Sequence, residues 1–214
     1  MARPRAPDYD QQRARILALA VRAFERTGYP SASMASLARA CGTSKAALYH
    51  YFASKDALLF EALDGHTRRL LALVESVQAA GLPARDELAQ VVRTLMLEYR
   101  SAHAYHAALV NDVKFLADDE RRAVRARERA VVDAIAATLA RAFPDRVTAA
   151  NRVVVTMALL GMINFTFAWL RPDGPMTHAE FAELVIELWT RGLEGARIPT
   201  LEGARHESAV RVQG

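Results

Sequence analysis

The stretch from Ser33 to Phe52 constrains the fold of this chain more than any other. Ser33 and Ser44 are hydroxyl residues suited to cap the starts of two short helices, and Gly42 between them allows the tight or left-handed turn that ends the first. The positions that share the inner faces of these helices are small or apolar: Leu37, Ala40, Cys41, Leu48 and Phe52. Two short helices across a glycine-containing turn predict a helix-turn-helix, although an αα-hairpin in a helical core has the same pattern.

The second of these helices suits the major groove of DNA, where the first turns of such a helix reach the base edges. Its short residues allow close approach: Thr43, Ser44, Ala46 and Ala47. Lys45 can reach a phosphate or a guanine edge, while Tyr49, His50 and Tyr51 offer hydroxyl, imidazole and ring edges to the sugar-phosphate backbone.

The same stretch resembles the DNA-binding signature of the TetR family of bacterial repressors. The matching positions are Ser33, Leu37, Ala38, Gly42, Ser44, Leu48, Tyr49, Tyr51, Phe52, Ser54, Lys55 and Leu58. Cys41 and Thr43 stand where the family usually has alanine and valine, and both are small enough to keep the fold. The resemblance implies these DNA-binding residues: Ser33, Thr43, Ser44, Lys45, Ala46, Tyr49, His50, Tyr51 and Lys55.

The resemblance also implies an all-α fold, with an N-terminal three-helix helix-turn-helix domain followed by a C-terminal helical domain for ligand binding and dimerisation. We expect four parts: a flexible basic arm at 1–9, the helix-turn-helix domain at 10–54, the effector-binding and dimerisation domain at 55–195, and a disordered tail at 196–214.

Positive charge is concentrated in the part of the chain that holds the motif. The formal net charge is +4, and residues 1–60 contain nine basic against four acidic residues, so the remainder is slightly acidic. This distribution fits a polyanionic partner such as double-stranded DNA. Pro4 and Pro7 disfavour a helix in the arm, where Arg3 and Arg5 could enter a minor groove or simply belong to an untethered terminus.

Cysteine content bears on the cellular compartment. Cys41 is the single cysteine, so an internal disulfide is impossible and a reducing compartment is expected. A redox role would need a partner thiol, and a buried small residue is the simpler interpretation. Because the N-terminal residues lack the apolar core of a signal peptide, we expect a cytoplasmic protein.

Apolar residues recur at helical spacing along most of the chain. We expect helices at 10–27, 55–80, 85–110 and 119–143, with an interruption at 111–119. The segment 153–170 is nearly continuously apolar, and an amphipathic helix follows it after a capping box of Thr177 and Glu180. Burial on all sides in a soluble protein explains the segment better than a membrane span does.

These last two helices have surplus apolar surface, which predicts a homodimer with a four-helix interface and no membrane association. A two-fold dimer would present two recognition helices to a palindromic operator with half-sites roughly 34 Å apart.

A TetR-like C-terminal part is expected to hold a small-molecule effector. The candidate effector-binding residues are Tyr99, His103, Asn111, Phe115, Asn164, Phe165, Phe167 and Trp169. Such a set suits an apolar, partly polar ligand, although aromatic residues at helical spacing are more often plain core. His103 and His106 lie three residues apart with Asp112 beyond, but a structural zinc site needs four ligands, so we expect no metal and no cofactor.

A narrower resemblance concerns the effector. The segments 111–116 and 159–174 resemble TetR-type repressors that control the breakdown of fatty, sterol-derived and aromatic acids, and the chain is similar to PaaR-type regulators of phenylacetate catabolism. This resemblance implies release from DNA by an acyl-CoA thioester such as phenylacetyl-CoA. The arginines from Arg121 to Arg129 could meet CoA phosphates or form a solvated face.

Three other functions stay open at this point. A multidrug-type regulator would take cationic lipophiles, but the apolar segment at 153–170 contains no carboxylate. An all-helical acyl-CoA enzyme is not expected, because the chain has no nucleophile elbow, phosphate-binding glycine loop or HExxH motif. A purely architectural DNA-binding protein would ignore every metabolite. Effectors can also promote DNA binding, so the sign of the response is open.

Overall fold

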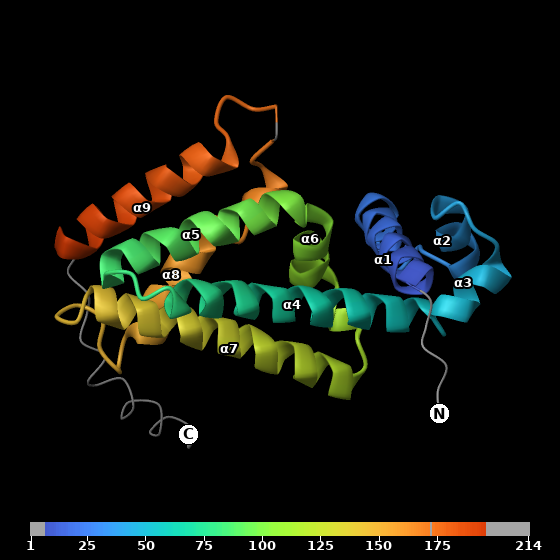
Figure 1. Cartoon of the computed structure of the whole chain (residues 1–214), viewed down its shortest axis with the longest axis horizontal. Coiled ribbons are helices and arrows are strands. Elements are labelled where there is room, and N and C mark those ends of the chain that lie inside the picture. The colour runs from blue at the N-terminus through green and yellow to red at the C-terminus, as the bar shows by residue number, and fades with distance from the viewer. Residues whose placement is uncertain (1–6, 172, 196–214) are drawn as a thin grey trace, which may run out of the picture. The chain divides into compact units, whose positions relative to one another are not determined.

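The computed structural model describes residues 7–171 and 173–195, and every regular element in these ranges is helical (Figure 1). The elements are α1 (Pro7–Thr27), α2 (Met34–Ala40), α3 (Lys45–Tyr51), α4 (Lys55–Ala79), α5 (Ala84–Ser101), α6 (His103–Asp112), the 3₁₀ turn η1 (Val113–Phe115), α7 (Asp118–Ala142), α8 (Arg152–Ile163), the 3₁₀ turn η2 (Thr166–Ala168) and α9 (His178–Gly195). The all-α prediction is confirmed. The expected tail at 196–214 and residues 1–6 of the expected arm, with Arg3 and Arg5, lie outside the described residues.

Two expected helix boundaries in the first half of the chain are wrong. α1 begins at Pro7, inside the expected arm. Proline is tolerated in the first turn of a helix, where a backbone N–H would have no intrahelical partner. The expected helix at 85–110 is two helices, because Ala102 leaves helical geometry, with φ −108° and ψ 31°. Apolar spacing continues across this break, so the sequence pattern could not reveal it.

The apolar segment at 153–170 is also not a single helix. α8 ends at Ile163, and η2 follows after Asn164 and Phe165. The Thr166 hydroxyl donates a hydrogen bond of 2.8 Å to the Ile163 carbonyl. Local bonds of this kind compete with the helical pattern, and a threonine in an apolar run is where this competition is expected.

Contacts divide the chain into two compact units, Met1–Leu71 with Glu98–Arg129 and Ala72–Leu97 with Ala130–Gly214. The first unit therefore contains more than the helix-turn-helix domain expected at 10–54. It also includes the start of α4, the whole of α6 and η1, and the start of α7.

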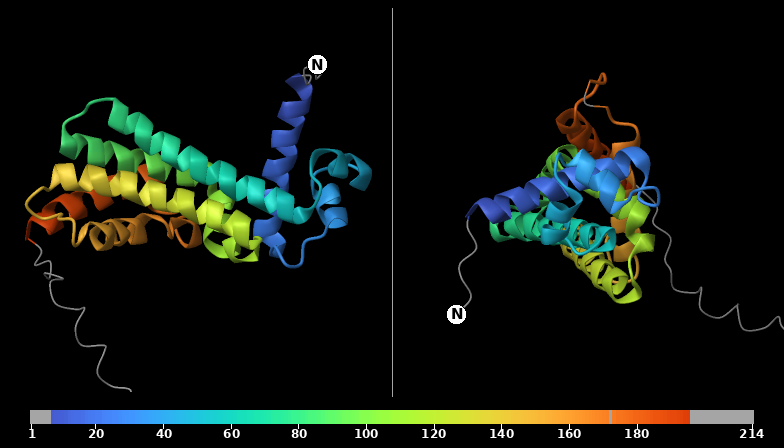
Figure 2. Two further views of the ribbon diagram at one scale, coloured as in Figure 1. Left: turned by 90° about the horizontal axis from the view of Figure 1, so that it is seen from below. Right: turned by 90° about the vertical axis from the view of Figure 1, so that its right-hand side faces the viewer.

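In the first unit, α1 packs against α2, and α2 packs against α3. The side chains buried between them are apolar: Ile16, Ala20, Phe24, Leu37, Leu48 and Phe52. Arg13 on α1 pairs with Glu61 on α4, and its guanidinium lies 4.6 Å from the ring centroid of Phe52. The C-terminal end of α1 lies beside α6 (Figure 2). Cys41 is buried, as expected for a small packing residue, and this burial raises the pKa of its thiol.

In the second unit, charged pairs connect α5 to α9 across its surface. The guanidinium of Arg93 donates to both carboxylate oxygens of Glu183, at 2.5 and 2.8 Å. The predicted capping box is confirmed: the Thr177 amide donates to Glu180 at 2.7 Å, and the Glu180 amide donates to the Thr177 hydroxyl at 3.2 Å. α9 therefore starts where the sequence indicated.

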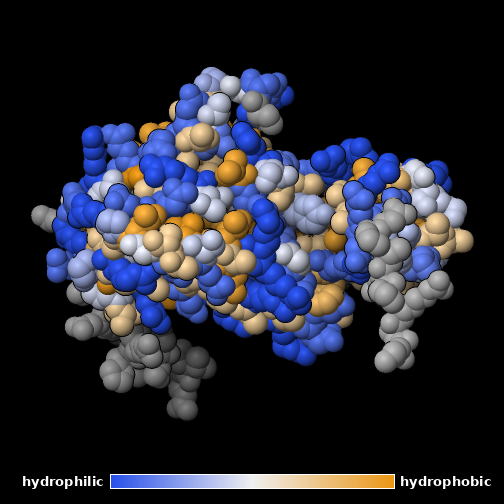
Figure 3. Space-filling view, in the orientation of Figure 1, coloured by the Kyte–Doolittle hydropathy of each residue, from blue (hydrophilic) through white to orange (hydrophobic). Residues whose placement is uncertain are grey.

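Polar side chains cover most of the face shown in Figure 3, with apolar side chains gathered over α5. Within the part of the chain that the structure describes, no helix combines the length and the apolar character needed to cross a membrane.

Candidate nucleic-acid interface

The helix-turn-helix is built from local hydrogen bonds that its sequence specifies. The Ser33 hydroxyl accepts from the Ser36 amide at 3.1 Å, and the Ser36 hydroxyl accepts from the Ser33 amide at 2.9 Å, so α2 begins with a reciprocal capping box. The Ser44 hydroxyl accepts from the Ala47 amide at 3.0 Å and caps α3. Gly42 has φ +65°, a left-handed conformation that disfavours any side chain with a Cβ. The predicted caps and turn are confirmed.

α3 has one buried and one open face. Leu48 is fully buried and anchors the helix to the core. The exposed residues are Ser44, Lys45, Ala46, Tyr49 and His50. The Lys45 ammonium lies 5.9 Å from the centroid of the Tyr49 ring. The open face therefore presents a cation, a phenol and an imidazole beside short side chains, which is the chemistry that a recognition helix needs.

The C-terminal end of α3 contacts the beginning of α1 through aromatic rings. The Tyr9 centroid lies 4.9 Å from that of Tyr51 and 5.7 Å from that of His50. Tyr51 is only half-exposed, so it has a packing role as well as its predicted role at the DNA backbone. Sequence reasoning missed Tyr9 because it assigned this residue to the arm, and only the early start of α1 would have pointed to it.

Three of the predicted DNA-binding residues have other roles within the motif. The ammonium of Lys55 lies 3.2 to 3.4 Å from the carbonyl oxygens of Tyr29, Pro30 and Ala32, so Lys55 holds the loop between α1 and α2. Ser33 uses its hydroxyl to cap α2. Thr43 is half-buried in the turn. Direct contact of these residues with DNA stays a prediction.

The eight predicted effector-binding residues divide between the two units, four in each. In the first unit, Tyr99 is buried and stacks on His106, with ring centroids 3.9 Å apart. His103 contacts Glu25 of α1 at 2.6 Å. Asn111 is exposed at the end of α6, and Phe115 belongs to η1.

In the second unit, the four predicted effector-binding residues follow α8. Asn164 is the half-buried C-cap of this helix. The rings of Phe165 and Phe167 lie 5.2 Å apart, and Trp169 meets Phe181 of α9 edge-on at 5.0 Å. The aromatic rings form local pairs, but Phe165 and Trp169 are more than half exposed, so they are not the plain core residues that the sequence also allowed.

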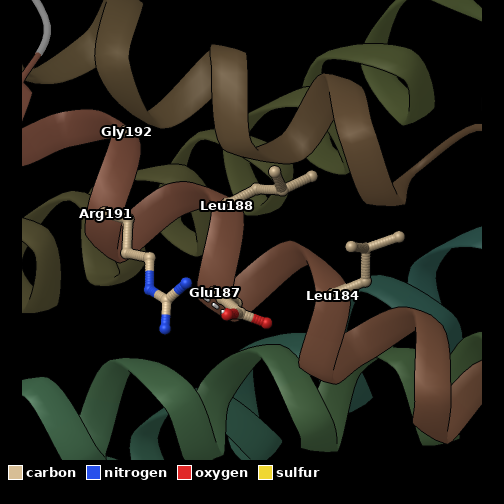
Figure 4. Close-up of a pocket in the computed structure, with 5 residues that line it drawn as sticks. All are labelled: Leu184, Glu187, Leu188, Arg191 and Gly192. Carbon is tan, nitrogen blue, oxygen red and sulfur yellow. Dashed lines mark ion pairs between the residues drawn. The ribbon is translucent and has the colours of Figure 1, made fainter.

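A surface groove of about 360 Å³ runs along α9 and contains none of the eight predicted residues. Its lining comes from α9 alone: Leu184, Glu187, Leu188, Arg191 and Gly192 (Figure 4). Glu187 and Arg191 form an ion pair of 2.7 Å, while the two leucines lie on another side of the helix. A groove beside one helix offers an apolar contact surface rather than an enclosed ligand cavity.

A buried histidine pair is another feature of the first unit that sequence reasoning missed. His66 on α4 lies with its Nε2 atom 3.4 Å from Nδ1 of His106 on α6. Burial above all, and then the charges of His106 and Arg69, lower the pKa of His66 to about 3. His66 is therefore neutral at ordinary pH.

His103 contacts Glu25, while His106 contacts His66 and Tyr99. No cluster of three or more histidine, cysteine or acidic residues suited to a metal occurs in residues 7–171 or 173–195.

The arginines of α7 are largely engaged by carboxylates. Arg121 pairs with Asp118, Arg125 with Glu128 at 2.9 Å, and Arg127 with the buried Asp64. These pairs favour the solvated-face interpretation of the run over a phosphate site.

Comparisons with known proteins agree with this architecture. Residues 16–62 match the family described as bacterial regulatory proteins, tetR family, and residues 81–193 match the family described as Tetracyclin repressor-like, C-terminal domain. Among curated relatives, the transcriptional repressor KstR2 of Rhodococcus jostii is 29% identical over 110 residues, which are 51% of this chain and 54% of that protein. The repressor Rv1474c of Mycobacterium tuberculosis is 37% identical over 78 residues, 36% of this chain and 41% of the relative. The chain thus spans about half the length of the curated relatives it matches.

Two solved structures extend the similarity over most of the chain. A TetR-family regulator from Bordetella parapertussis has a TM-score of 0.80 and 30% identity, covering 87% of this chain and 98% of that one. AibR, in complex with isovaleryl coenzyme A and operator DNA, has a TM-score of 0.73 and 25% identity. The match covers 83% of this chain and 97% of that one. With both parts of the sequence matched to one family, the chain belongs to the TetR family of bacterial transcriptional regulators.

Proposed function

We propose that this protein is a cytoplasmic, homodimeric transcriptional repressor that binds a palindromic operator and is released from it by a CoA thioester. The observation that carries the DNA-binding part is the open face of α3, where Lys45, Tyr49 and His50 project from a helix fixed by a serine cap and a left-handed glycine. Repression then follows from occupation of the promoter, and release follows when the effector prefers a conformation that binds DNA poorly.

Exposed apolar side chains on α8 and α9 support the homodimer. They are Val153, Val154, Met157, Leu184 and Leu188. Large apolar side chains grouped on adjacent helices favour association with a second copy of the same surface, as in four-helix interfaces. A dimer would place two copies of α3 against two half-sites, which one short helix could not read with comparable specificity.

Two observations support a CoA thioester as the effector. AibR, which resembles this chain over most of its length, forms a complex with isovaleryl coenzyme A and operator DNA. The chain itself supplies aromatic side chains directly after Asn164, at Phe165, Phe167 and Trp169, which suit the apolar acyl part of such a ligand. Phenylacetyl-CoA is our first candidate because of the resemblance to regulators of phenylacetate catabolism.

The test is a fluorescence-anisotropy titration of the purified protein on DNA from upstream of its own gene. Phenylacetyl-CoA and isovaleryl-CoA are then added, with the free acids and free CoA as matched controls. We expect one thioester to release the DNA while its acid and CoA do not. DNA binding that no thioester changes would refute the acyl-CoA part alone, and lipophilic cations would then test a multidrug-type effector. Hydrolysis of a thioester by the protein would instead support an enzyme.

A further inference from the structure

A residue outside the helix-turn-helix packs directly on the loop that precedes α2. The Phe115 ring of η1 stacks on Tyr29, with centroids 5.3 Å apart and an interplanar angle of 27°. Tyr29 is buried in the loop between α1 and α2, whereas Phe115 is 40% exposed. Both residues belong to the first compact unit. The stack therefore joins the DNA-binding part to the segment that follows α6.

Tyr29 is the centre of the contacts that hold this loop. Its hydroxyl donates to Asp56 at the start of α4, and its ring meets Phe24 at 5.1 Å. The Lys55 ammonium lies 4.5 Å from the ring centroid and bonds to carbonyls of the same loop. The Ala32 amide donates to the Tyr29 carbonyl at 3.1 Å. Burial first, and then the bond to Asp56, raise the pKa of Tyr29, so its phenol remains a neutral donor.

The position of this loop determines where α2 starts. Ser33, the N-cap of α2, follows Ala32 directly, and α3 is joined to α2 by the Gly42 turn. Lys55 and Asp56 hold the polar atoms of Tyr29, while Phe115 covers a face of its ring. Removing Phe115 would expose that face to water and allow the loop to move while every polar contact stays available.

The segment from α6 to η1 makes a second contact with the DNA-binding part, at the start of α6. His103, the first residue of α6, lies 2.6 Å from Glu25 in the last turns of α1. The segment from α6 to η1 therefore contacts the DNA-binding part at both of its ends, through His103 and through Phe115. α1 and α6 pack side by side between these points.

We infer that Phe115 is a positioning residue for operator binding, which holds α2 and α3 in their DNA-binding placement through its stack on Tyr29. The inference rests on the proposed function in one respect, that the helix-turn-helix binds an operator. It assigns Phe115 to the coupling between the C-terminal part and the DNA-binding helices, in place of the direct effector contact expected from the sequence.

The experiment compares Phe115→Ala, Phe115→Tyr and Leu82→Ala. Leu82 is a matched control because it is 39% exposed and belongs to the other unit. We expect Phe115→Ala to weaken operator binding by roughly two- to tenfold, the equivalent of losing one aromatic pair, with the salt slope unchanged because no phosphate contact is lost. Phe115→Tyr keeps the ring, so this variant should bind the operator with wild-type affinity. Leu82→Ala should also bind with wild-type affinity.

Hydrogen exchange of the DNA-free protein provides the second readout. We expect Phe115→Ala to speed exchange at the Ala32 amide and in α2, and to leave the amides of α9 at their wild-type rates. A purely global loss of stability would instead speed exchange in the most protected amides of both units alike.

Two results would overturn the inference. One is wild-type operator affinity in Phe115→Ala with unchanged exchange at the Ala32 amide. The other is operator binding by Phe115→Tyr that is as weak as that of Phe115→Ala. If the wild-type protein binds no upstream DNA, the proposed function is refuted. The exchange data then still decide whether Phe115 holds the loop.

Discussion

Lys45 and His66 show how differently two single residues can serve this regulator. Lys45 is exposed on α3 and available to a partner, whereas His66 is buried in the first unit against another histidine. The first should determine DNA affinity with little effect on folding. The second should determine stability with no direct contact to DNA.

We expect Lys45→Ala to weaken specific operator binding by roughly 1–3 kcal/mol if the ammonium reads a base, or to reduce the salt slope by about one if it meets only a phosphate. The measurement is anisotropy at several salt concentrations, with Arg100→Ala, an exposed cation of α5, as the control. Unchanged affinity and slope would mean that Lys45 does not face the DNA.

His66 should make the stability of the protein pH-dependent. Its folded-state pKa of about 3 lies below the unfolded value of about 6.5, so the unfolded state binds more protons between these values. The contribution of His66 to the free energy of unfolding is complete above about pH 6.5. It is lost as the pH falls towards about 3, by at most about 1.4 kcal/mol per pH unit.

The check is urea denaturation of the wild type and of His66→Gln between pH 7 and pH 4. His66→Gln should flatten the dependence of the free energy of unfolding on pH. Parallel curves for the wild type and His66→Gln would contradict the assignment.

At the scale of elements, the turn between α2 and α3 and the break between α5 and α6 differ in their origin. The turn depends on Gly42 and the two serine caps, which act within a few residues. The break at Ala102 has no such marker, and α6 is placed by contacts made from its side chains, including His106 with His66 on α4.

We expect Gly42→Ala to destabilise the protein by roughly 1–2 kcal/mol, because alanine is strained at φ +65° even though nothing lies within 4 Å of the added Cβ. Gly65 on α4 is the matched control: its surroundings are equally open, but its φ is not positive. There alanine should stabilise by up to about 1 kcal/mol. Chemical denaturation measures both, and equal signs for the two variants would refute the strain argument.

At the scale of the whole molecule, the dimer determines whether the recognition helices can act together. Its proposed surface consists of apolar side chains on α8 and α9 that have no cover within the described chain. Charge placed there should separate the subunits, while charge on an equally exposed leucine elsewhere should not.

We expect Leu188→Glu to shift the protein to a monomer in sedimentation equilibrium and to weaken operator binding in parallel. Leu188 is 54% exposed on α9, and Leu97, at 57% on α5, provides the control Leu97→Glu. A Leu188→Glu protein that remains dimeric, or a Leu97→Glu protein that becomes monomeric, would place the interface on another surface.

Local sequence patterns were sufficient to predict the all-α class, the helix-turn-helix with its two serine caps and Gly42, the capping box before α9 and the burial of Cys41. These features depend on hydrogen bonds and backbone preferences within a few residues, so a local pattern is sufficient to find them. The folded structure was needed to find that Lys55 holds a loop, that Tyr9 reaches the end of α3, that His66 meets His106 and that Phe115 packs on Tyr29. Each of these contacts joins residues far apart in the sequence, and helical periodicity says which face of a helix is apolar without saying what that face will meet.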